Sequence, residues 1–340
     1  MLQHQLRAWT RALPGLTLVI ALTCVACCAS PAESRVLVPV GRIGAGWGDH
    51  ASGWMRFVAF NAAGTRVASD GPADPEDTSG DLTLWSFPAG RLIRHVKHRP
   101  DALSDDWKYI ANAQGIRDLN GGEDLIAAGA GAGAIVAFSH DDRYAVEAPI
   151  APGAPAIRIV ALPRGGEIRA FGTHHPFSLA ISPDNAVLAA GHWNMVALWD
   201  VARGRRLAVL YGAARYVEGL SFSRDGRWLA AGGDFGVLEV WDLRRRRKVW
   251  SIDLGGLDVS APAFSPDGKY VAAGVYGTGS VFLVSVASGK RVDHRRVSGI
   301  GCGAVAFSPD GRFLIAPSSG GLVTWPPDRG GIIRVFRVKR

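Results

Sequence analysis

The chain has 340 residues, 48% of them hydrophobic and 20% charged. This is enough apolar material for a sizeable core, and it excludes a mainly disordered chain. The 43 glycines follow no three-residue period and no heptad is sustained, so collagen-like and coiled-coil structures are excluded. A net charge of +8 would fit a nucleic-acid partner. Two of the arginines, however, lie in an N-terminal segment that we expect to be removed, and we predict no nucleic-acid partner.

The first 29 residues are predicted to be a signal peptide. A polar start with two arginines precedes an apolar run, Leu16 to Ala29, that is shorter than the ~20 residues needed to cross a bilayer. Two cleavage patterns fit. Val25-Ala26-Cys27 resembles a bacterial lipoprotein signal, with Cys27 as the lipidation candidate, whereas ordinary signal peptidase would cut after Ala29 or Ala32. Either pattern predicts an exported protein, either a periplasmic or outer-membrane-anchored lipoprotein or a secreted one.

An internal repeat organises the chain after residue 50. Each copy has a short apolar strand, a small polar residue, a turn rich in Asp and Gly, and a second strand rich in Ala and Val. The copies begin at Phe60, Leu103, Phe138, Ile181, Phe222, Phe264 and Phe307. They are spaced by 43, 35, 43, 41, 42 and 43 residues, close to the ~40–45 residues of a four-stranded propeller blade.

The turn and the third strand of each copy give the repeat its character. In Ser265-Pro266-Asp267-Gly268, Pro fixes φ, Asp bonds back to the backbone and Gly takes the positive-φ position, which makes a tight turn. The third strand alternates apolar and polar residues and ends in Trp-Asp at 199/200 and at 241/242. Residues 35–340 thereby resemble the WD40 repeat family. The resemblance implies an all-β fold, a single seven-bladed β-propeller with four-stranded antiparallel blades.

Two features of the repeat affect this prediction. The Gly-His pair that opens a WD40 repeat is nearly absent, so we expect the blades to depend on apolar stacking more than on the family's Asp-His-Ser-Trp hydrogen bonds. For ring closure, Ile332 to Val338 is either the third strand of the last blade, with residues 35–40 as its outer strand, or itself the outer strand after a third strand at Leu322 to Trp325. We favour the first arrangement because it gives residues 35–43 a place, and Pro39 is tolerated on an edge strand.

Turns between the second and third strands carry the residues that we predict to bind a partner. Exposed aromatic side chains near a channel mouth are typical interface anchors, and the alternative role for them is packing between adjacent blades. The histidine among them is expected to be an exposed loop residue. The predicted partner-binding residues are His192, Trp193, Asn194, Phe235 and Tyr276.

Turns between the third and fourth strands form a predicted basic rim on the opposite face. Such runs of like charge are usually a solvated surface. The functional hypothesis is docking of an acidic protein or of anionic envelope lipid. The rim comprises Arg203, Arg205, Arg206, Arg244, Arg245, Arg246, Arg247 and Lys248.

No catalytic residue, cofactor or metal site is predicted, because neither a Gly-x-Ser-x-Gly nor a His-Glu-x-x-His motif occurs. Cys302 stands apart from the three N-terminal cysteines, so no disulfide framework follows. The leading hypothesis is a non-catalytic, exported scaffold of the bacterial cell envelope, a monomeric propeller that binds a protein partner. The alternative is a propeller enzyme, a lactonase-like hydrolase or quinoprotein-like oxidoreductase. Three or more His, Asp or Glu side chains converging around a central pocket would favour the enzyme.

Overall fold

The strands of the computed structural model form six antiparallel sheets, which confirms the all-β class. The structure describes residues 36–43, 57–70, 81–98, 100–112, 115–121, 124–127, 134–149, 157–172, 175–298, 301–318 and 332–339. Four sheets have four strands, one has five and one has six. Over these residues there is no helix, and hence none long and apolar enough to cross a membrane.

The strands of each sheet follow one another along the chain, except where the chain's first strand joins the last sheet. The first sheet contains β2 (Val58–Phe60), β3 (Arg66–Asp70), β4 (Leu82–Ser86) and β5 (Leu92–Val96). The second contains β6 (Ala102–Leu103), β7 (Tyr109–Asn112), β8 (Gly115–Asp118) and β9 (Asp124–Ala127). The third contains β10 (Ala134–Phe138), β11 (Tyr144–Pro149), β12 (Ile157–Ala161) and β13 (Glu167–Phe171). The six-stranded sheet contains β14 (Ser178–Ile181), β15 (Val187–Asp200), β16 (Arg205–Phe222), β17 (Trp228–Gly233), β18 (Val237–Asp242) and β19 (Arg247–Asp253). The five-stranded sheet contains β20 (Asp258–Val259), β21 (Ala263–Phe264), β22 (Tyr270–Tyr276), β23 (Ser280–Ser285) and β24 (Arg291–Arg296). The last sheet contains β25 (Ala306–Phe307), β26 (Phe313–Ser318), β27 (Ile332–Val338) and β1 (Leu37–Ile43).

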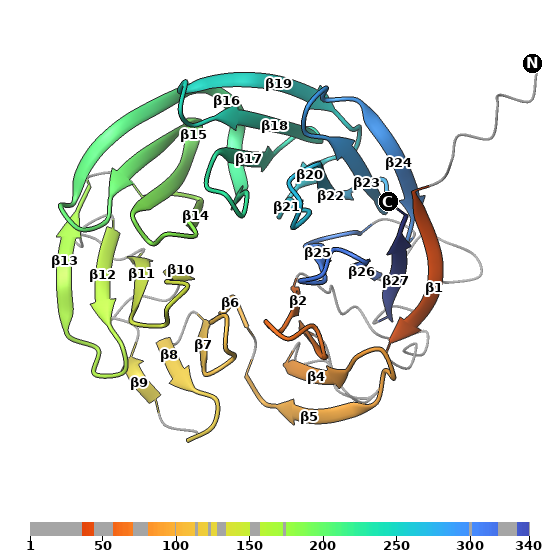
Figure 1. The fold of residues 1–340 in the computed structure, drawn as a ribbon. Coiled ribbons are helices and arrows are strands. Elements are labelled where there is room, and N and C mark those ends of the chain that lie inside the picture. The colour runs from red at the N-terminus through yellow and green to blue at the C-terminus, as the bar shows by residue number, and fades with distance from the viewer. Residues whose placement is uncertain are drawn as a thin grey trace, which may run out of the picture. The chain divides into compact units, whose positions relative to one another are not determined.

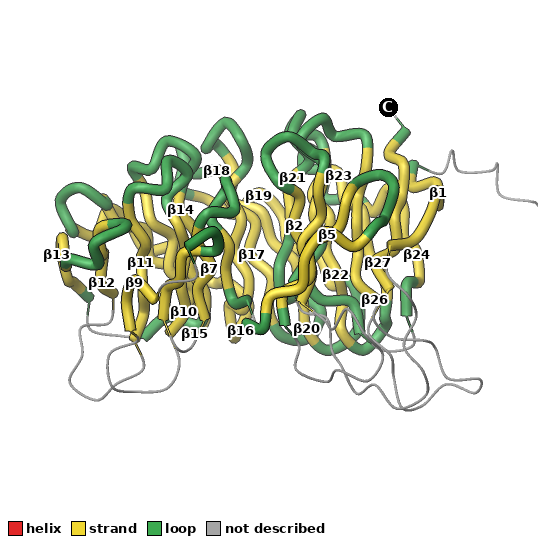
Figure 2. The backbone as a smooth tube through the Cα atoms, turned by 90° about the horizontal axis from the view of Figure 1, so that it is seen from below, coloured by secondary structure: helices red, strands yellow, loops and turns green. Residues whose placement is uncertain are grey.

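Figure 1 shows these sheets following one another around a common centre, with the first strand of each repeat innermost. The innermost strands contact one another in series, from β6 through β10, β14, β16, β21 and β25 to β2. Figure 2 shows the strands standing side by side, with the turns gathered at two opposite faces. This arrangement is consistent with the blades of a β-propeller.

Strand β16 explains why seven sequence copies give six sheets. Its first part, up to Tyr211, pairs with β15, and its last part, from Val217, pairs with β17. Strand β15 also serves twice, because residues 188–191 pair with β14 and residues 195–200 pair with β16. Two copies of the repeat therefore share one continuous strand and form a single hydrogen-bonded sheet.

The last sheet is completed by the start of the chain. Strand β27 pairs on one side with β26 and on the other with β1, from Leu37 opposite Val338 to Ile43 opposite Ile333. The favoured arrangement of the ring closure is confirmed and its alternative is wrong; Leu322 to Trp325 lies outside the described residues. Strand β1 is the free edge of its sheet, where the missing N–H of Pro39 leaves no ladder bond unmade.

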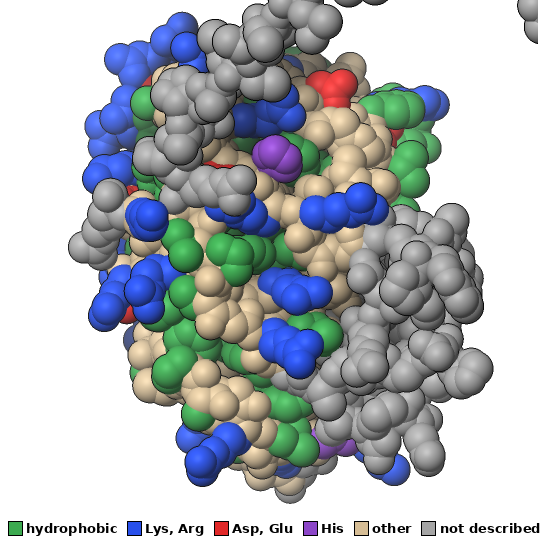
Figure 3. Space-filling model, turned by 90° about the vertical axis from the view of Figure 1, so that its right-hand side faces the viewer, with side chains coloured by type: hydrophobic (Ala, Val, Ile, Leu, Met, Phe, Trp, Pro, Cys, Tyr) green, Lys and Arg blue, Asp and Glu red, His purple; other side chains and the backbone are tan. Residues whose placement is uncertain are grey.

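The outermost strands β24 and β1, together with β27 beside β1, make this side of the molecule rich in arginine. Strands β24, β1 and β27 together contain six arginines and one aspartate. Figure 3 views the side on which these strands lie, and Lys and Arg side chains are spread across it among hydrophobic ones. Charges on edge strands oppose pairing with other chains.

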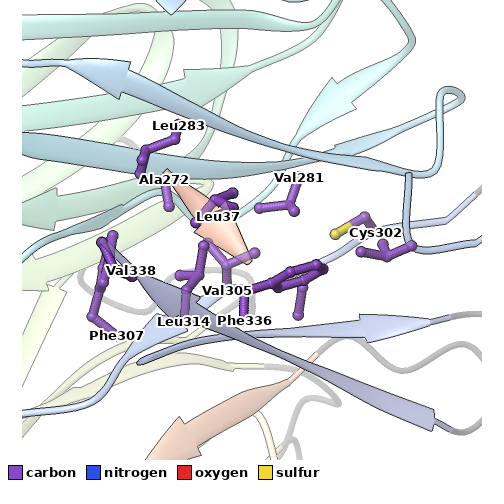
Figure 4. Packing of buried hydrophobic residues seen from close by; sticks show 12 residues of the cluster. Leu37, Ala272, Val281, Leu283, Cys302, Val305, Phe307, Leu314, Phe336 and Val338 are labelled. Carbon is purple, nitrogen blue, oxygen red and sulfur yellow. The ribbon is translucent and has the colours of Figure 1, made fainter. Parts of the chain in front are cut away.

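The core beneath this side joins the two ends of the described chain. Leu37 is fully buried in a cluster with Phe336 and Val338 from β27 and with Val281 from the neighbouring sheet (Figure 4). The Leu37 N–H donates to Asp293 Oδ2 at 2.8 Å, and the Arg295 guanidinium donates to the Leu37 carbonyl at 2.9 Å. Strand β1 is thus held by apolar packing and by hydrogen bonds to β24. The cluster also encloses Cys302, whose thiol pKa burial raises to about 12.

The repeat turns form as their residues predict. In five copies the Ser Oγ donates to an Asp Oδ1 two residues later, at 2.6–2.9 Å. Gly226, Gly268 and Gly311 occupy the last position of three of these turns with φ of +66° to +69°. The Ser residues are buried, and each Oγ also accepts a backbone N–H. The turn is therefore a closed hydrogen-bonded unit that the local sequence specifies.

A buried Ser-Trp hydrogen bond distinguishes the first sheet from the two Trp-Asp repeats. The Trp85 Nε1–H donates to Ser69 Oγ at 3.1 Å. The equivalent indole N–H groups of Trp199 and Trp241 are buried and have no partner within the described residues. The prediction that the blades lack the family's Ser-Trp bond is therefore confirmed for these two repeats and wrong for the first sheet. The reason is local, because Ala231 occupies in β17 the position that Ser69 has in β3.

Replacing Ala231 with serine is expected to raise the free energy of unfolding by about 1 kcal/mol, because the hydroxyl supplies the acceptor that Trp241 lacks. Urea unfolding of A231S and of the wild type measures this change in the free energy of unfolding. The matched control is A230S, since Ala230 is equally buried but lies on the other face of β17. That variant should be destabilised, and the reverse change S69A should lose about 1 kcal/mol. Equal effects of A231S and A230S would contradict the explanation.

Candidate functional site

An aromatic cluster lies where β15 and β16 pair at Trp193 and Tyr216, next to the start of β14. The Trp193 and Tyr216 rings meet edge to face with centroids 4.4 Å apart, and Phe177 meets Tyr216 at 5.2 Å. The Arg215 guanidinium lies 4.6 Å from the centre of the Trp193 ring. Trp193 and Phe177 are nonetheless 49% and 44% exposed. The cluster is therefore held by its own members while it presents a large apolar area to solvent.

The cluster continues onto the next two repeats. The Tyr216 N–H donates to Asp234 Oδ1 at 3.1 Å. The backbones of Asp234 and Asp258 form an isolated antiparallel β-bridge. The residues beside these two aspartates, Phe235 and Leu257, are 62% and 55% exposed. The aromatic face is the name used below for Phe177, Trp193, Tyr216, Phe235 and Leu257. It spans adjacent repeats at one end of the strands.

Two of the predicted partner-binding residues lie on the aromatic face and three do not. Trp193 and Phe235 are exposed on it, and neither is packed away between blades. His192 is 7% exposed, so the expectation of an exposed loop histidine is wrong. The reason is that β15 continues through residue 192, and strand alternation places its side chain opposite that of Trp193. Tyr276 is half-buried, and Asn194 forms the turn with φ +56°.

Phe177, Tyr216 and Leu257 were missed by the sequence argument. They lie in or beside the segments that lead from the fourth strand of one repeat to the first strand of the next. In an antiparallel four-stranded unit those segments emerge at the same end as the turns between the second and third strands. The turns between the second and third strands and the segments between successive repeats therefore both contribute residues to the aromatic face, whereas the sequence prediction used the turns alone.

Carboxylates border the aromatic face. Burial, followed by repulsion from Asp258 and Asp234, raises the pKa of Glu218. Burial and the charge of Asp234 likewise raise the pKa of Asp258. The three acidic groups, Glu218, Asp234 and Asp258, lie close together and give this part of the surface a negative potential. The aromatic face is therefore apolar in its middle and acidic at one border.

A cavity of about 740 Å³ occupies the centre of the sheets and is lined by the first strand and turn of each repeat. Among its described lining residues, Asp105 and His140 are the two of the His, Asp and Glu kind. This is fewer than the three that would favour an enzyme. No group of three His, Cys, Asp or Glu side chains that could hold a metal ion occurs among the described residues.

The two nitrogens of the His140 ring are both engaged. Nδ1 lies 2.7 Å from Asp105 Oδ2 and Nε2 lies 3.2 Å from the Ile181 carbonyl. Both partners accept hydrogen bonds, so this geometry favours the protonated ring, in which both nitrogens donate. The hydrogen bond with Asp105 raises the pKa of His140. His140 links three repeats in this way.

Asp142 lies in the same turn as His140 and is expected to make stability depend on pH. Burial, with the hydrogen bond and charge of Asp106, raises its pKa from 3.8 to about 6. The folded chain thus favours the protonated form, and the stability that this adds is complete below about pH 4 and lost as the pH rises through 6. D142N should therefore raise the free energy of unfolding at pH 8 by about 1 kcal/mol, after allowance for solvent screening.

Urea unfolding of D142N and the wild type at pH 5 and pH 8 measures this effect, and the gain should shrink at pH 5. Asn also suits the φ of +54° at this position. The control is D141N on the same turn, where the carboxylate is 40% exposed and lies 3.6 Å from Arg143; its effect should stay within about 0.5 kcal/mol. A gain for D142N that is the same at both pH values would show that Asp142 ionises normally.

The predicted basic rim is partly neutralised by the aspartates of the two Trp-Asp pairs. Asp200 Oδ2 lies 3.0 Å from Arg203 and 3.7 Å from Arg205, and Asp242 Oδ2 lies 2.8 Å from Arg245. The hydrogen bonds from Arg203 and Arg245 lower the pKa of these two carboxyl groups. Lys248 pairs with the buried Glu239 at 2.6 Å. Four of the eight rim residues are thus in ion pairs, and in two of these pairs, Asp200–Arg203 and Asp242–Arg245, the partners are three residues apart in the sequence.

The remaining rim residues are arginines exposed to solvent. They make no ion pair within the described ranges, and they are Arg206, Arg244, Arg246 and Arg247. Arg246 holds φ +51°, at the turn position where Gly90, Gly165, Gly204 and Gly289 stand in other repeats. The docking role of the rim stays a prediction.

Comparison with known proteins agrees with the geometry over one repeat. Residues 204–242 match the family model of the WD domain, G-beta repeat. The matched segment begins before β16 and ends with β18, so it runs from the outer strand of one repeat through three strands of the next. No curated protein matches the chain. The class that fold and match define is an all-β protein with a WD40 repeat, a domain type that typically serves as a protein-interaction scaffold.

Proposed function

We propose that the chain is an exported, seven-bladed propeller that binds a protein partner through its aromatic face. The observation that carries the proposal is the exposure of Trp193, Phe235 and Leu257 on adjacent repeats. Exposed aromatic side chains held in place by their neighbours are typical binding hot spots, because little conformational entropy is lost when a partner covers them. A non-catalytic scaffold role accounts for this surface.

The backbone at Phe235 supports the same proposal. Its φ of +59° lies in the left-handed region, which is unfavourable for a bulky side chain. The ring is 62% exposed at this position, where a glycine or asparagine would suit the turn better. Strained residues of this kind gather at functional surfaces.

The blade count and the export are part of the proposal. Seven blades follow if the two halves of the six-stranded sheet, which share β16, are two blades. The proposed export is to the bacterial cell envelope, with the first 29 residues as signal peptide and Cys27 as a possible lipid attachment; these residues lie outside the described part of the chain. The count is supported by the cavity lining, to which the turns of all seven repeats contribute.

Site-specific photo-crosslinking in the producing cell tests the partner-binding role. A photoreactive phenylalanine analogue is placed at Trp193, at Phe235 and, as the control, at Ile168, which is 54% exposed on the outer strand β13. The same protein should be captured from positions 193 and 235 and not from 168. W193A combined with F235A should weaken the binding of that protein about 30-fold. Capture from all three positions alike, or from none, would contradict the proposal.

A further inference from the structure

The side of the molecule formed by β24, β1 and β27 carries unpaired positive charge. The basic lateral surface is the name used here for Arg42, Arg291, Arg334, Arg337 and Lys339. Arg334 is half-buried and the other four are exposed. None of the five takes part in an ion pair over the described ranges, although Arg295 beside them lies 3.3 Å from Asp293. Figure 3 shows this side with its cations spread across it.

The register of the last sheet places two of these positive charges opposite each other. Arg42 on β1 stands directly opposite Arg334 on β27. Like charges directly opposite each other in a sheet are destabilising. At the basic rim, by contrast, Asp200 and Asp242 neutralise the arginines nearest to them. The lateral surface thus keeps a repulsion that an external anion would relieve, and guanidinium groups bind phosphate well.

The shape of this surface indicates an extended partner. Its side chains come from the outermost strands β24 and β1 and from β27 and the residue that follows it, and none of them lines the central cavity or the smaller cavity beside Asn61 and Leu119. Positive charge spread over several strands complements negative charge that is also spread out. A bilayer with anionic headgroups has that distribution, and basic side chains each add to the binding near such a surface.

We propose that the basic lateral surface docks on an anionic phospholipid bilayer. For its orientation the inference rests on the proposed export and on the lipid attachment at Cys27. Leu37 follows Cys27 by ten positions, and an extended chain of that length spans at most ~35 Å. Strand β1, the first element after the anchor, is then held close to the membrane, and Arg42 lies on that strand.

Vesicle flotation of the full chain, as processed by the producing cell, tests the inference. One set of vesicles is phosphatidylcholine alone. The other contains about 30% phosphatidylglycerol, an anionic lipid that attracts basic surfaces. The wild type should prefer the anionic vesicles, and the preference should fall with added salt because exposed charges are screened. R42E combined with R337E should reduce binding to the anionic vesicles at least about 25-fold.

The matched control is R164E combined with R169E. It changes the net charge equally, but at exposed residues on the turn before β13 and on β13 itself, across the ring in Figure 1. It should keep the anionic preference, and both double variants should unfold at the wild-type urea concentration. Equal binding of the wild type to the two kinds of vesicle, or equal loss in both variants, would overturn the inference. If the wild type did not bind phosphatidylcholine vesicles at all, that result would contradict the lipid attachment. The comparison of the wild type with the two variants on anionic vesicles would still decide whether the basic lateral surface docks.

Discussion

Replacing Leu37 with alanine is expected to lower the free energy of unfolding by about 3 kcal/mol. Leu37 is fully buried between the last sheet and the one before it, so the substitution removes three side-chain carbons and leaves a cavity. The surrounding residues, among them Phe336 and Val338, belong to rigid strands that cannot collapse into the space without breaking β-sheet hydrogen bonds. Chemical denaturation, with the midpoint and slope both fitted, measures the loss.

The matched control for Leu37 is Val40 on the same strand. Val40 is 43% exposed, and V40A should change the free energy of unfolding by no more than about 0.5 kcal/mol. A loss for L37A as small as that of V40A would mean that β1 does not close the last sheet in solution. Because β1 contacts both β27 and β24, a large loss in L37A is also expected to appear as a single cooperative transition at a lower denaturant concentration.

Replacing Gly274 with alanine is expected to cost about 3 kcal/mol, at the upper end of the usual range for overpacking. A Cβ at this position would lie 2.1 Å from the Gly303 carbonyl oxygen and 2.9 Å from that of Cys302. Both obstacles are backbone atoms of the next sheet, so no side-chain rotation relieves the clash. The two sheets would have to move apart, and the surrounding core would lose its packing.

Gly41 provides the control for this substitution, since a Cβ there would meet nothing within 4 Å. G41A should be neutral within about 0.5 kcal/mol, and thermal unfolding of both variants measures the difference. If G274A were as stable as G41A, the sheets would be packed less closely than the structure has them. Gly191 and Gly232 stand at equivalent positions, where a Cβ would lie 2.8 Å and 2.4 Å from backbone oxygens of the neighbouring repeat.

The sequence Ala-Ala-Gly at the end of three second strands shows what could be predicted and what could not. The residues 189–191, 230–232 and 272–274 were recognised as part of a repeat rich in small side chains. Their small size has a cause that only the packed sheets reveal, namely the approach of backbone from the next repeat. Pattern alone could not separate this requirement from simple strand composition.

The residues of the aromatic face likewise divide into those that the sequence indicated and those that only the packed sheets reveal. Trp193 and Phe235 were found from their place in a turn, which is local information. Tyr216, which contacts Trp193, and Leu257, which lies near Phe235, belong to other parts of the chain, and the sheets bring them together. The buried position of His192 was missed because a turn was expected where the strand continues. The pairing of Arg203 with Asp200 was within reach, since three residues separate them.

The sequence by itself determined the class of fold, the seven repeated turns, and the use of the chain's first strand to complete its last sheet. Each of these depends on chemistry within a few residues, such as the Ser-x-Asp-Gly turn, or on the number of strands available. Only the tertiary structure decided which side chains are buried or exposed, which arginines are neutralised, and that two repeats share β16. These properties depend on the spacing and register of neighbouring sheets, and a one-residue difference in register moves a side chain to the other face.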